Sequence, residues 1–148
     1  MRTALAILMA LLLTACESKS RDPVALEPDD ACASCRMLIS ERRYAAELID
    51  GEEEVYKFDD IACMLRFARL RGIERSKATF YVMDYAGGKD WIEGTQAHFI
   101  KFRSSVSSPM ASGIVAFRDA ASAATAGSKE GPLTFQELWS QETSTEHR

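Results

Sequence analysis

Three absences limit what this chain of 148 residues can do. It has no basic stripe and a formal net charge of −4, so it lacks the electrostatic footprint of a nucleic-acid-binding protein. Its apolar run at residues 4–13 is too short for a membrane-spanning helix. The second half contains neither a CxxC nor an HxxxH pattern, so a common type of zinc site has no second ligand pair there.

The first residues have the pattern of an export signal. Arg2 supplies the positive start, the apolar run follows, and a Leu-Thr-Ala-Cys motif ends at Cys16. This motif resembles a bacterial lipobox, in which the cysteine is acylated and becomes the first residue of the mature chain. Several acyl chains on one residue anchor a protein firmly, and Glu17 in place of Asp resembles lipoproteins of the outer membrane. A plain secretory signal with a chance cysteine is the alternative.

Acylation of Cys16 would leave three cysteines, Cys32, Cys35 and Cys63. An odd number in an exported protein leaves at least one free thiol. A free thiol outside the cytoplasm usually has a use.

The segment Cys-Ala-Ser-Cys-Arg-Met at residues 32–37 is the centre of the chemistry. It offers two thiols and a thioether, soft donors that favour a soft ion, Cu(I) above all. Cys35 and Met37 point the same way if the chain between them is extended. We therefore expect an exposed loop with sulfur atoms at its tip.

Three other interpretations compete with copper. Cys32 and Cys35 could form a structural disulfide in an oxidising compartment. A zinc site could use both of them with Cys63 and His98. A thioredoxin-like dithiol would need the CxxC at the start of a helix after a buried strand, but residues 27–30 are polar and contain a proline.

Alternating and helical patterns predict the elements of the first half. Strands are expected at residues 39–48 and 54–58, joined by a hairpin turn at Asp50-Gly51. Asp59 is a good N-cap and Asp60 adds a carboxylate to the first turn of a helix that ends at Gly72. A buried strand follows at residues 79–83.

The second half repeats the strand and helix pattern. Strands are expected at residues 91–92, 97–102 and 114–117, followed by a helix from Asp119 to Gly127. Thr134 and Glu137 form a capping box for a last helix. A shift of 59 residues lays the Phe-x-Asp at residues 58–60 on the Phe-x-Asp at residues 117–119, which suggests an internal duplication.

The expected fold class is α+β, with two related ββαβ-type halves of mixed or antiparallel sheet, each with a helix, in one compact unit. The expected organisation is a signal peptide, a tether, a first half with the sulfur-rich loop, a second half and a flexible tail. Their respective ranges are residues 1–15, 16–30, 31–84, 85–141 and 142–148.

The ordered set of motifs resembles the NosL family, the copper-binding lipoproteins that accompany bacterial nitrous oxide reductase. The motifs are the lipobox, CxxCxM at residues 32–37, FDDIxCM at residues 58–64 and PMxSGIxAF at residues 109–117. The resemblance implies a fold of two related ββαβ-type halves. It also implies a Cu(I) carrier, without catalytic activity, that helps assemble the copper centres of the reductase. The implied partners are copper, the apo-reductase and a membrane ABC-type transporter, and the implied location is the periplasmic side of a membrane.

Cys35 and Met37 are the first candidates as Cu(I) ligands, because the family motif centres on that pair and a thiolate with a thioether suits Cu(I). Cys32 comes next, either as a second thiolate or as a disulfide partner. Met110, in a Pro/Gly-rich loop, could swing over the site as a weaker sulfur ligand. Three further residues are expected to be packing residues: Cys63, Met64 and His98.

Two other functions remain open. One is a thiol–disulfide oxidoreductase that uses Cys32 and Cys35, for which Met37 would be dispensable. The other is a structural lipoprotein in which a bridge between the same cysteines holds a loop in place.

Overall fold

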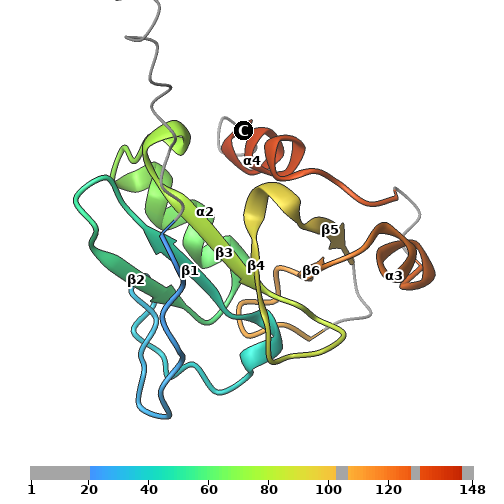
Figure 1. The fold of residues 1–148 in the computed structure, drawn as a ribbon, viewed down its shortest axis with the longest axis horizontal. Helices are drawn as coiled ribbons and strands as arrows, with labels where there is room; N and C mark the ends of the chain where they lie inside the picture. Colours follow the sequence, from blue (N-terminus) through green and yellow to red (C-terminus); the bar gives the residue numbers. More distant parts are fainter. Residues whose placement is uncertain (1–20, 103–106, 128–130, 145–148) are drawn as a thin grey trace, which may run out of the picture.

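The computed structural model describes residues 21–102, 107–127 and 131–144 (Figure 1). The predicted signal peptide, Cys16 and the last tail residues, among them His147, lie outside the described residues. Within the described ranges, no helix combines the length and the apolar character needed to cross a membrane.

An antiparallel sheet of four strands, in the order β2-β1-β3-β4, forms the larger part of the protein. Its strands are β1 (Ala46–Ile49), β2 (Val55–Phe58), β3 (Thr79–Met83) and β4 (Trp91–Glu93). Helix α2 (Ile61–Leu70) packs against one face, because its apolar stripe meets the inward side chains of β1, β2 and β3. The opposite face is crossed by residues 21–30, here called the N-terminal strap (Figure 1).

Polar side chains of all four strands hold the N-terminal strap. Glu47 of β1 is buried and accepts the Val24 N–H at 2.9 Å. Lys57 of β2 donates to the Ala25 carbonyl at 2.7 Å, Tyr81 of β3 donates to the Arg21 carbonyl, and Trp91 of β4 donates to the Val24 carbonyl at 3.2 Å. The strap is therefore part of the folded unit.

A smaller two-stranded sheet, β5 (His98–Lys101) and β6 (Ile114–Phe117), carries helix α3 (Ala120–Thr125). It joins the larger sheet where the Tyr85 N–H donates to the Ala116 carbonyl at 2.8 Å. The last helix, α4 (Phe135–Ser144), places Phe135 and Leu138 in the same hydrophobic core as α2. Both sheets thus share one core.

The predicted α+β class is confirmed. The capping box is also present, since the Thr134 N–H donates to Glu137 at 2.8 Å and the Glu137 N–H donates back at 3.3 Å. The first predicted strand is shorter than expected, because a 3-10 turn (Arg42–Tyr44) precedes β1. Strand β4, in the second half of the sequence, pairs with β3 of the first.

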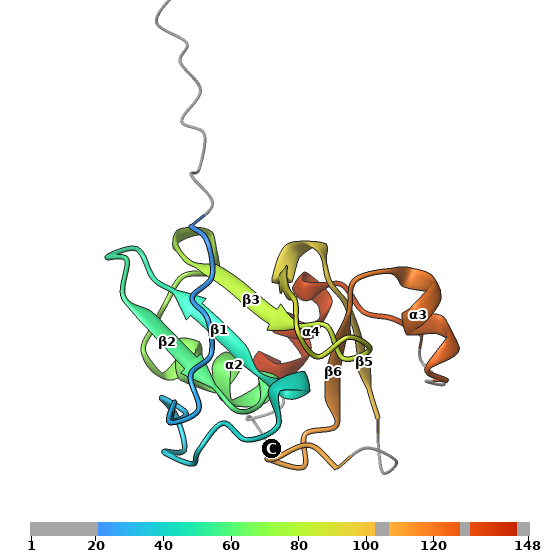
Figure 2. The same cartoon turned by 60° about the horizontal axis from the view of Figure 1, so that its bottom comes forward.

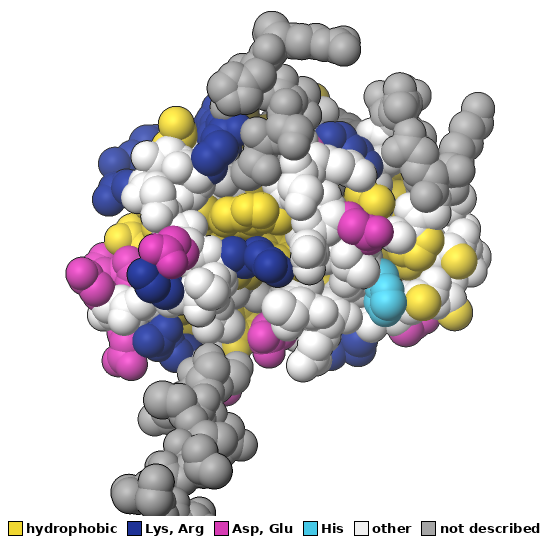
Figure 3. Space-filling view, turned by 90° about the horizontal axis from the view of Figure 1, so that it is seen from above, with side chains coloured by type: hydrophobic (Ala, Val, Ile, Leu, Met, Phe, Trp, Pro, Cys, Tyr) yellow, Lys and Arg dark blue, Asp and Glu magenta, His cyan; other side chains and the backbone are white. Residues whose placement is uncertain are grey.

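The charges on the surface are mixed. On the face drawn in Figure 3, basic and acidic side chains lie singly or in small groups among uncharged ones. The basic side chains of the described residues on this face do not merge into one band.

Candidate metal centre

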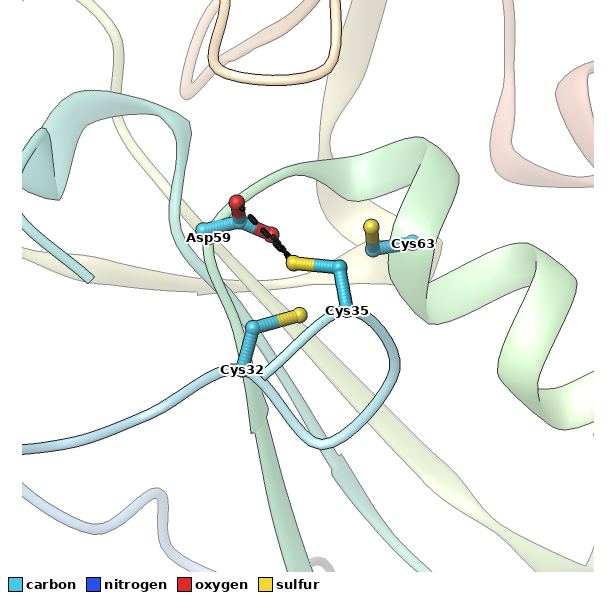
Figure 4. A group of neighbouring side chains, drawn as sticks. All are labelled: Cys32, Cys35, Asp59 and Cys63. Atoms are coloured by element: carbon cyan, nitrogen blue, oxygen red, sulfur yellow. Dashed lines mark hydrogen bonds between the residues drawn. The ribbon is translucent and has the colours of Figure 1, made fainter. Parts of the chain in front are cut away.

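Four side chains that could hold a metal ion converge at one end of α2 (Figure 4). They are Cys32, Cys35, Asp59 and Cys63, here called the cysteine–aspartate cluster. The three sulfur atoms and one carboxylate oxygen all lie within 4.8 Å of one another. The three cysteines are free thiols.

Two of the thiols come from a tight hairpin at residues 31–38, here called the cysteine hairpin. The Cys32 N–H donates to the Met37 carbonyl at 2.8 Å, and the Arg36 N–H donates to the Cys32 carbonyl at 2.9 Å. Arg36 adopts a left-handed conformation, φ 67°, which turns the chain back after Cys35. The Ala33 N–H donates to the Lys57 carbonyl at 2.8 Å, so the hairpin is fixed to the edge strand β2.

The other two members come from the junction between β2 and α2. Asp60, not the predicted Asp59, is the N-cap of α2 and accepts the Ala62 N–H at 2.8 Å. The helix starts at Ile61, so Cys63 lies in its first turn. Asp59 is left free to face the hairpin, where its two carboxylate oxygens lie 3.5 and 3.4 Å from the Cys35 Sγ. The predicted N-cap is therefore wrong by one residue.

The cluster is closed on one side and open on the other. Cys32, Asp59 and Cys63 are 0%, 1% and 2% exposed, while Cys35 is half-buried. An ion can therefore reach the cluster past Cys35.

The thiols differ in how readily they ionise. A hydrogen bond from Cys63 is the main reason why the pKa of Cys32 falls to about 6, and the backbone N–H groups of Cys35 and Asp59 add to it against the opposing effect of burial. The same hydrogen bond, with burial, raises the pKa of Cys63. Burial is the main cause of the raised pKa of Cys35. One thiolate is thus ready at neutral pH, and a metal ion would displace the remaining protons.

Met37 does not have the expected relation to Cys35. The chain between them is not extended, because Arg36 is left-handed. Instead the register of the hairpin places Met37 directly across from Cys32. Met37 is 46% exposed, so it lies at the surface of the hairpin.

Met110 lies in residues 108–113, here called the Met110 loop, and is 38% exposed. This loop and the cysteine hairpin lie at the same end of the molecule (Figure 2). The Met110 N–H donates to the Asp60 carboxylate at 3.3 Å, so this residue lies at the start of the helix that carries Cys63. His98, on β5, is not part of the cluster, and it lies near Asp119, whose pKa it helps to lower.

Two members of the cluster are not predicted as copper ligands by the sequence. It places Cys63 in the core, where the residue does lie, or in a zinc site, and it places Asp59 at a helix cap. The odd number of cysteines in the expected mature chain was the available signal for Cys63. No local pattern marks Asp59, since its role depends on which of two adjacent carboxylates caps the helix.

The arrangement also bears on the competing interpretations. The CxxC lies in a hairpin and not at the start of a helix, so the thioredoxin-like geometry is absent from this segment. A zinc site that includes His98 does not form, because that residue is outside the cluster.

Comparisons with known proteins give one family and one similar fold. A sequence model of the NosL family matches residues 23–138 of this chain. Among solved structures, the fold is similar to the crystal structure of the copper chaperone NosL from Shewanella denitrificans. The two share 21% sequence identity with a TM-score of 0.62, over 72% of this chain and 85% of that one. No curated protein matches this chain.

Proposed function

This chain belongs to the NosL family, and on that premise we propose that it is a copper chaperone that holds Cu(I) in the cysteine–aspartate cluster. The observation that carries the proposal is the convergence of three thiols and a carboxylate within 4.8 Å, with one thiol accessible from outside. Three sulfur donors at one point favour a soft ion.

We assign the copper to sulfur and not to Asp59. A carboxylate oxygen is a hard donor and suits Cu(I) poorly. Asp59 is also a hydrogen-bond acceptor for the Cys35 thiol. Its proposed role is therefore to orient Cys35, as outer partners orient metal ligands in other sites.

Release requires an opening, and Cys35 supplies it. Cu(I) bound by two or three sulfur atoms is unsaturated, so a donor atom of an acceptor can bind before the Cys35 sulfur leaves. Met37 in the cysteine hairpin and Met110 in the loop bound to Asp60 are both exposed, and they are proposed as weaker ligands on the route of the ion. No bond to carbon changes in such an exchange, so the protein needs no catalytic residues.

The strap relates the position of the cluster to the start of the described chain. Arg21, the first described residue, donates to the Asp50 carbonyl at 2.9 Å in the turn between β1 and β2. Asp59 follows Phe58, which pairs with Ala46 at the opposite end of the same two strands. The cluster therefore lies at the opposite end of these two strands from Arg21, where the described part of the chain begins.

The delivery partners follow from the family resemblance. We propose that the chain is a lipoprotein of the periplasmic side, anchored in the outer membrane. There it would supply copper to apo nitrous oxide reductase and exchange it with an ABC-type transporter.

Anaerobic titration of Cu(I) against a competing chelator tests the proposal. We expect tight binding by the wild type and a large loss in Cys35→Ser. Ser34→Ala is the matched control, because Ser34 lies in the same hairpin, is not part of the cluster and accepts a hydrogen bond from Arg66 at 3.2 Å. Failure of the wild type to bind Cu(I) would reject the proposed function, and equal affinities for the wild type and Cys35→Ser would reject Cys35 as a ligand.

A thiol–disulfide oxidoreductase is the second candidate, and the lowered pKa of Cys32 is the observation in its favour. Access argues against it. Cys32 is fully buried, while the accessible Cys35 has a raised pKa. A disulfide substrate would therefore meet the less reactive thiol first.

A further inference from the structure

Asp60 joins the two halves of the chain at the metal centre. Its carboxylate is fully buried and caps α2 through the Ala62 N–H. It also accepts the Ser112 hydroxyl at 2.7 Å and the Met110 N–H at 3.3 Å, both from the Met110 loop of the second half. One carboxylate thus fixes the loop to the first turn of α2.

Capping alone does not require a buried carboxylate. Helix caps commonly lie at the surface, where serine or threonine serve nearly as well. Among the ion pairs of the described residues none involves Asp60, so its charge is balanced by hydrogen-bond donors and by the positive end of α2. Burial of a charge is costly without such partners. The contact with the Met110 loop therefore explains why a carboxylate is buried at this position.

The Met110 loop is itself held in one conformation. The Gly113 N–H donates to the Ser108 hydroxyl at 3.1 Å, and the Ala111 N–H donates to the Ser108 carbonyl at 2.9 Å. Gly113 has φ 67°, and a Cβ there would lie 2.1 Å from the Phe102 carbonyl oxygen. No other residue fits this position without a shift of the backbone. These hydrogen bonds close the loop on itself, and the Asp60 carboxylate fixes the closed loop to the start of α2.

We propose that Asp60 is a positioning residue that holds Met110 at the opening of the cysteine–aspartate cluster, and that it thereby controls how fast Cu(I) leaves. This inference depends on the proposed copper function. Met110 would bind the ion by its thioether in addition to the cysteine sulfurs, and this further bond must also break before the ion leaves. Copper stays Cu(I) throughout, so no electron moves.

The rate at which an excess of chelator removes Cu(I) from the loaded protein is the measurement. We expect Met110→Leu to accelerate removal about tenfold, the size seen when a partner around a metal site is lost. Asp60→Asn should do the same, because the amide offers only one acceptor oxygen for its three donors. The double variant Asp60→Asn/Met110→Leu should be no faster than Met110→Leu alone.

Asp119→Asn is the matched control, since Asp119 caps α3 but is exposed and holds no loop of the other half. Its removal rate should equal that of the wild type. Should Asp60→Asn fail to fold, Ser112→Ala takes its place. The comparison of the single variants with the double variant is then repeated with the Asp60 carboxylate intact. A merely structural role predicts that either variant loses stability and that its effect on the rate multiplies with that of Met110→Leu.

The outcomes separate the two proposals. If the wild type does not bind Cu(I), the proposed function fails. If the wild type binds Cu(I) tightly but the Asp60 and Met110 effects multiply, or are absent, only the positioning role is wrong.

Discussion

The two strand-to-helix junctions of this protein are built alike but differ in chemistry. At the first, β2 leads into α2 through Asp60, and at the second, β6 leads into α3 through Asp119. Each aspartate accepts a backbone N–H of its own helix at 2.8 Å. The shift of 59 residues that aligns these caps also lays Cys63 on Ser122.

The surroundings make the difference. Ser122 donates its hydroxyl to Asp119 at 2.8 Å, so the side chain is used within its own exposed helix turn. Cys63 points from a buried turn toward the cysteine hairpin (Figure 4). The comparison teaches that the motif provides the helix start, whereas the facing hairpin turns one junction into a candidate metal centre.

Replacement of Cys63 by Ser makes the first junction resemble the second and should have the largest effect. We expect Cu(I) affinity to fall about 100-fold or more, because a direct ligand matters more than an outer partner. Competition with a chelator measures it, and Ser122→Ala should leave the affinity unchanged. If Cys63→Ser bound Cu(I) as tightly as the wild type, Cys63 would be a core residue and not a ligand.

Removal of the two caps should separate their structural roles. Asp60→Ala leaves the Met110 N–H and the Ser112 hydroxyl without their acceptor in a buried place, which should cost about 2–4 kcal/mol of unfolding free energy. Asp119→Ala should cost clearly less, since its partners can bind water. Urea denaturation compares them, and equal losses would mean that the buried contact adds nothing.

The ionisation of Cys32 should depend on its neighbour at the first junction. In the wild type one thiol should ionise near pH 6, because the hydrogen bond from Cys63 stabilises the thiolate. In Cys63→Ala that pKa should rise toward its ordinary value. Ultraviolet absorbance of the thiolate against pH follows the change in metal-free protein, and an unaltered curve would contradict the assignment of the hydrogen bond.

The smallest effect is expected at the second junction in acid. Hydrogen bonds from Ser122 lower the pKa of Asp119 below its ordinary 3.8. The stabilisation is therefore complete above that pH and is lost as the pH falls through the lowered value. Asp119→Asn should slightly reduce the unfolding free energy near neutral pH. It should also make that free energy fall less steeply as the pH is lowered. Parallel stability curves for the two proteins would show that the cap is not charge-dependent.

Much of the fold could be predicted because the patterns are local. The apolar stripe predicted α2, the Thr134 and Glu137 pair predicted the start of α4, and alternation predicted β2 and β3. The boundary errors have causes that are not local. The turn before β1 and the choice of Asp60 as cap depend on neighbours that packing supplies.

The candidate site could be predicted only in part. Residue types alone pointed to soft ligation at Cys32 and Cys35, and both lie in the cluster. The assumed geometry of Met37 failed because the left-handed Arg36 turns the chain, which side-chain spacing does not reveal. Cys63 and Asp59 join the hairpin only through packing of α2 and β2.

By itself, the sequence determined which donors are available, because thiol and thioether chemistry belongs to the residues wherever they lie. It also determined the helices and strands, because hydrophobic period and capping act over a few neighbours. Only the tertiary structure decided which sulfur atoms meet, which aspartate faces them and which loop of the second half lies beside them. These relations join segments far apart in the chain, and the shared core brings them together.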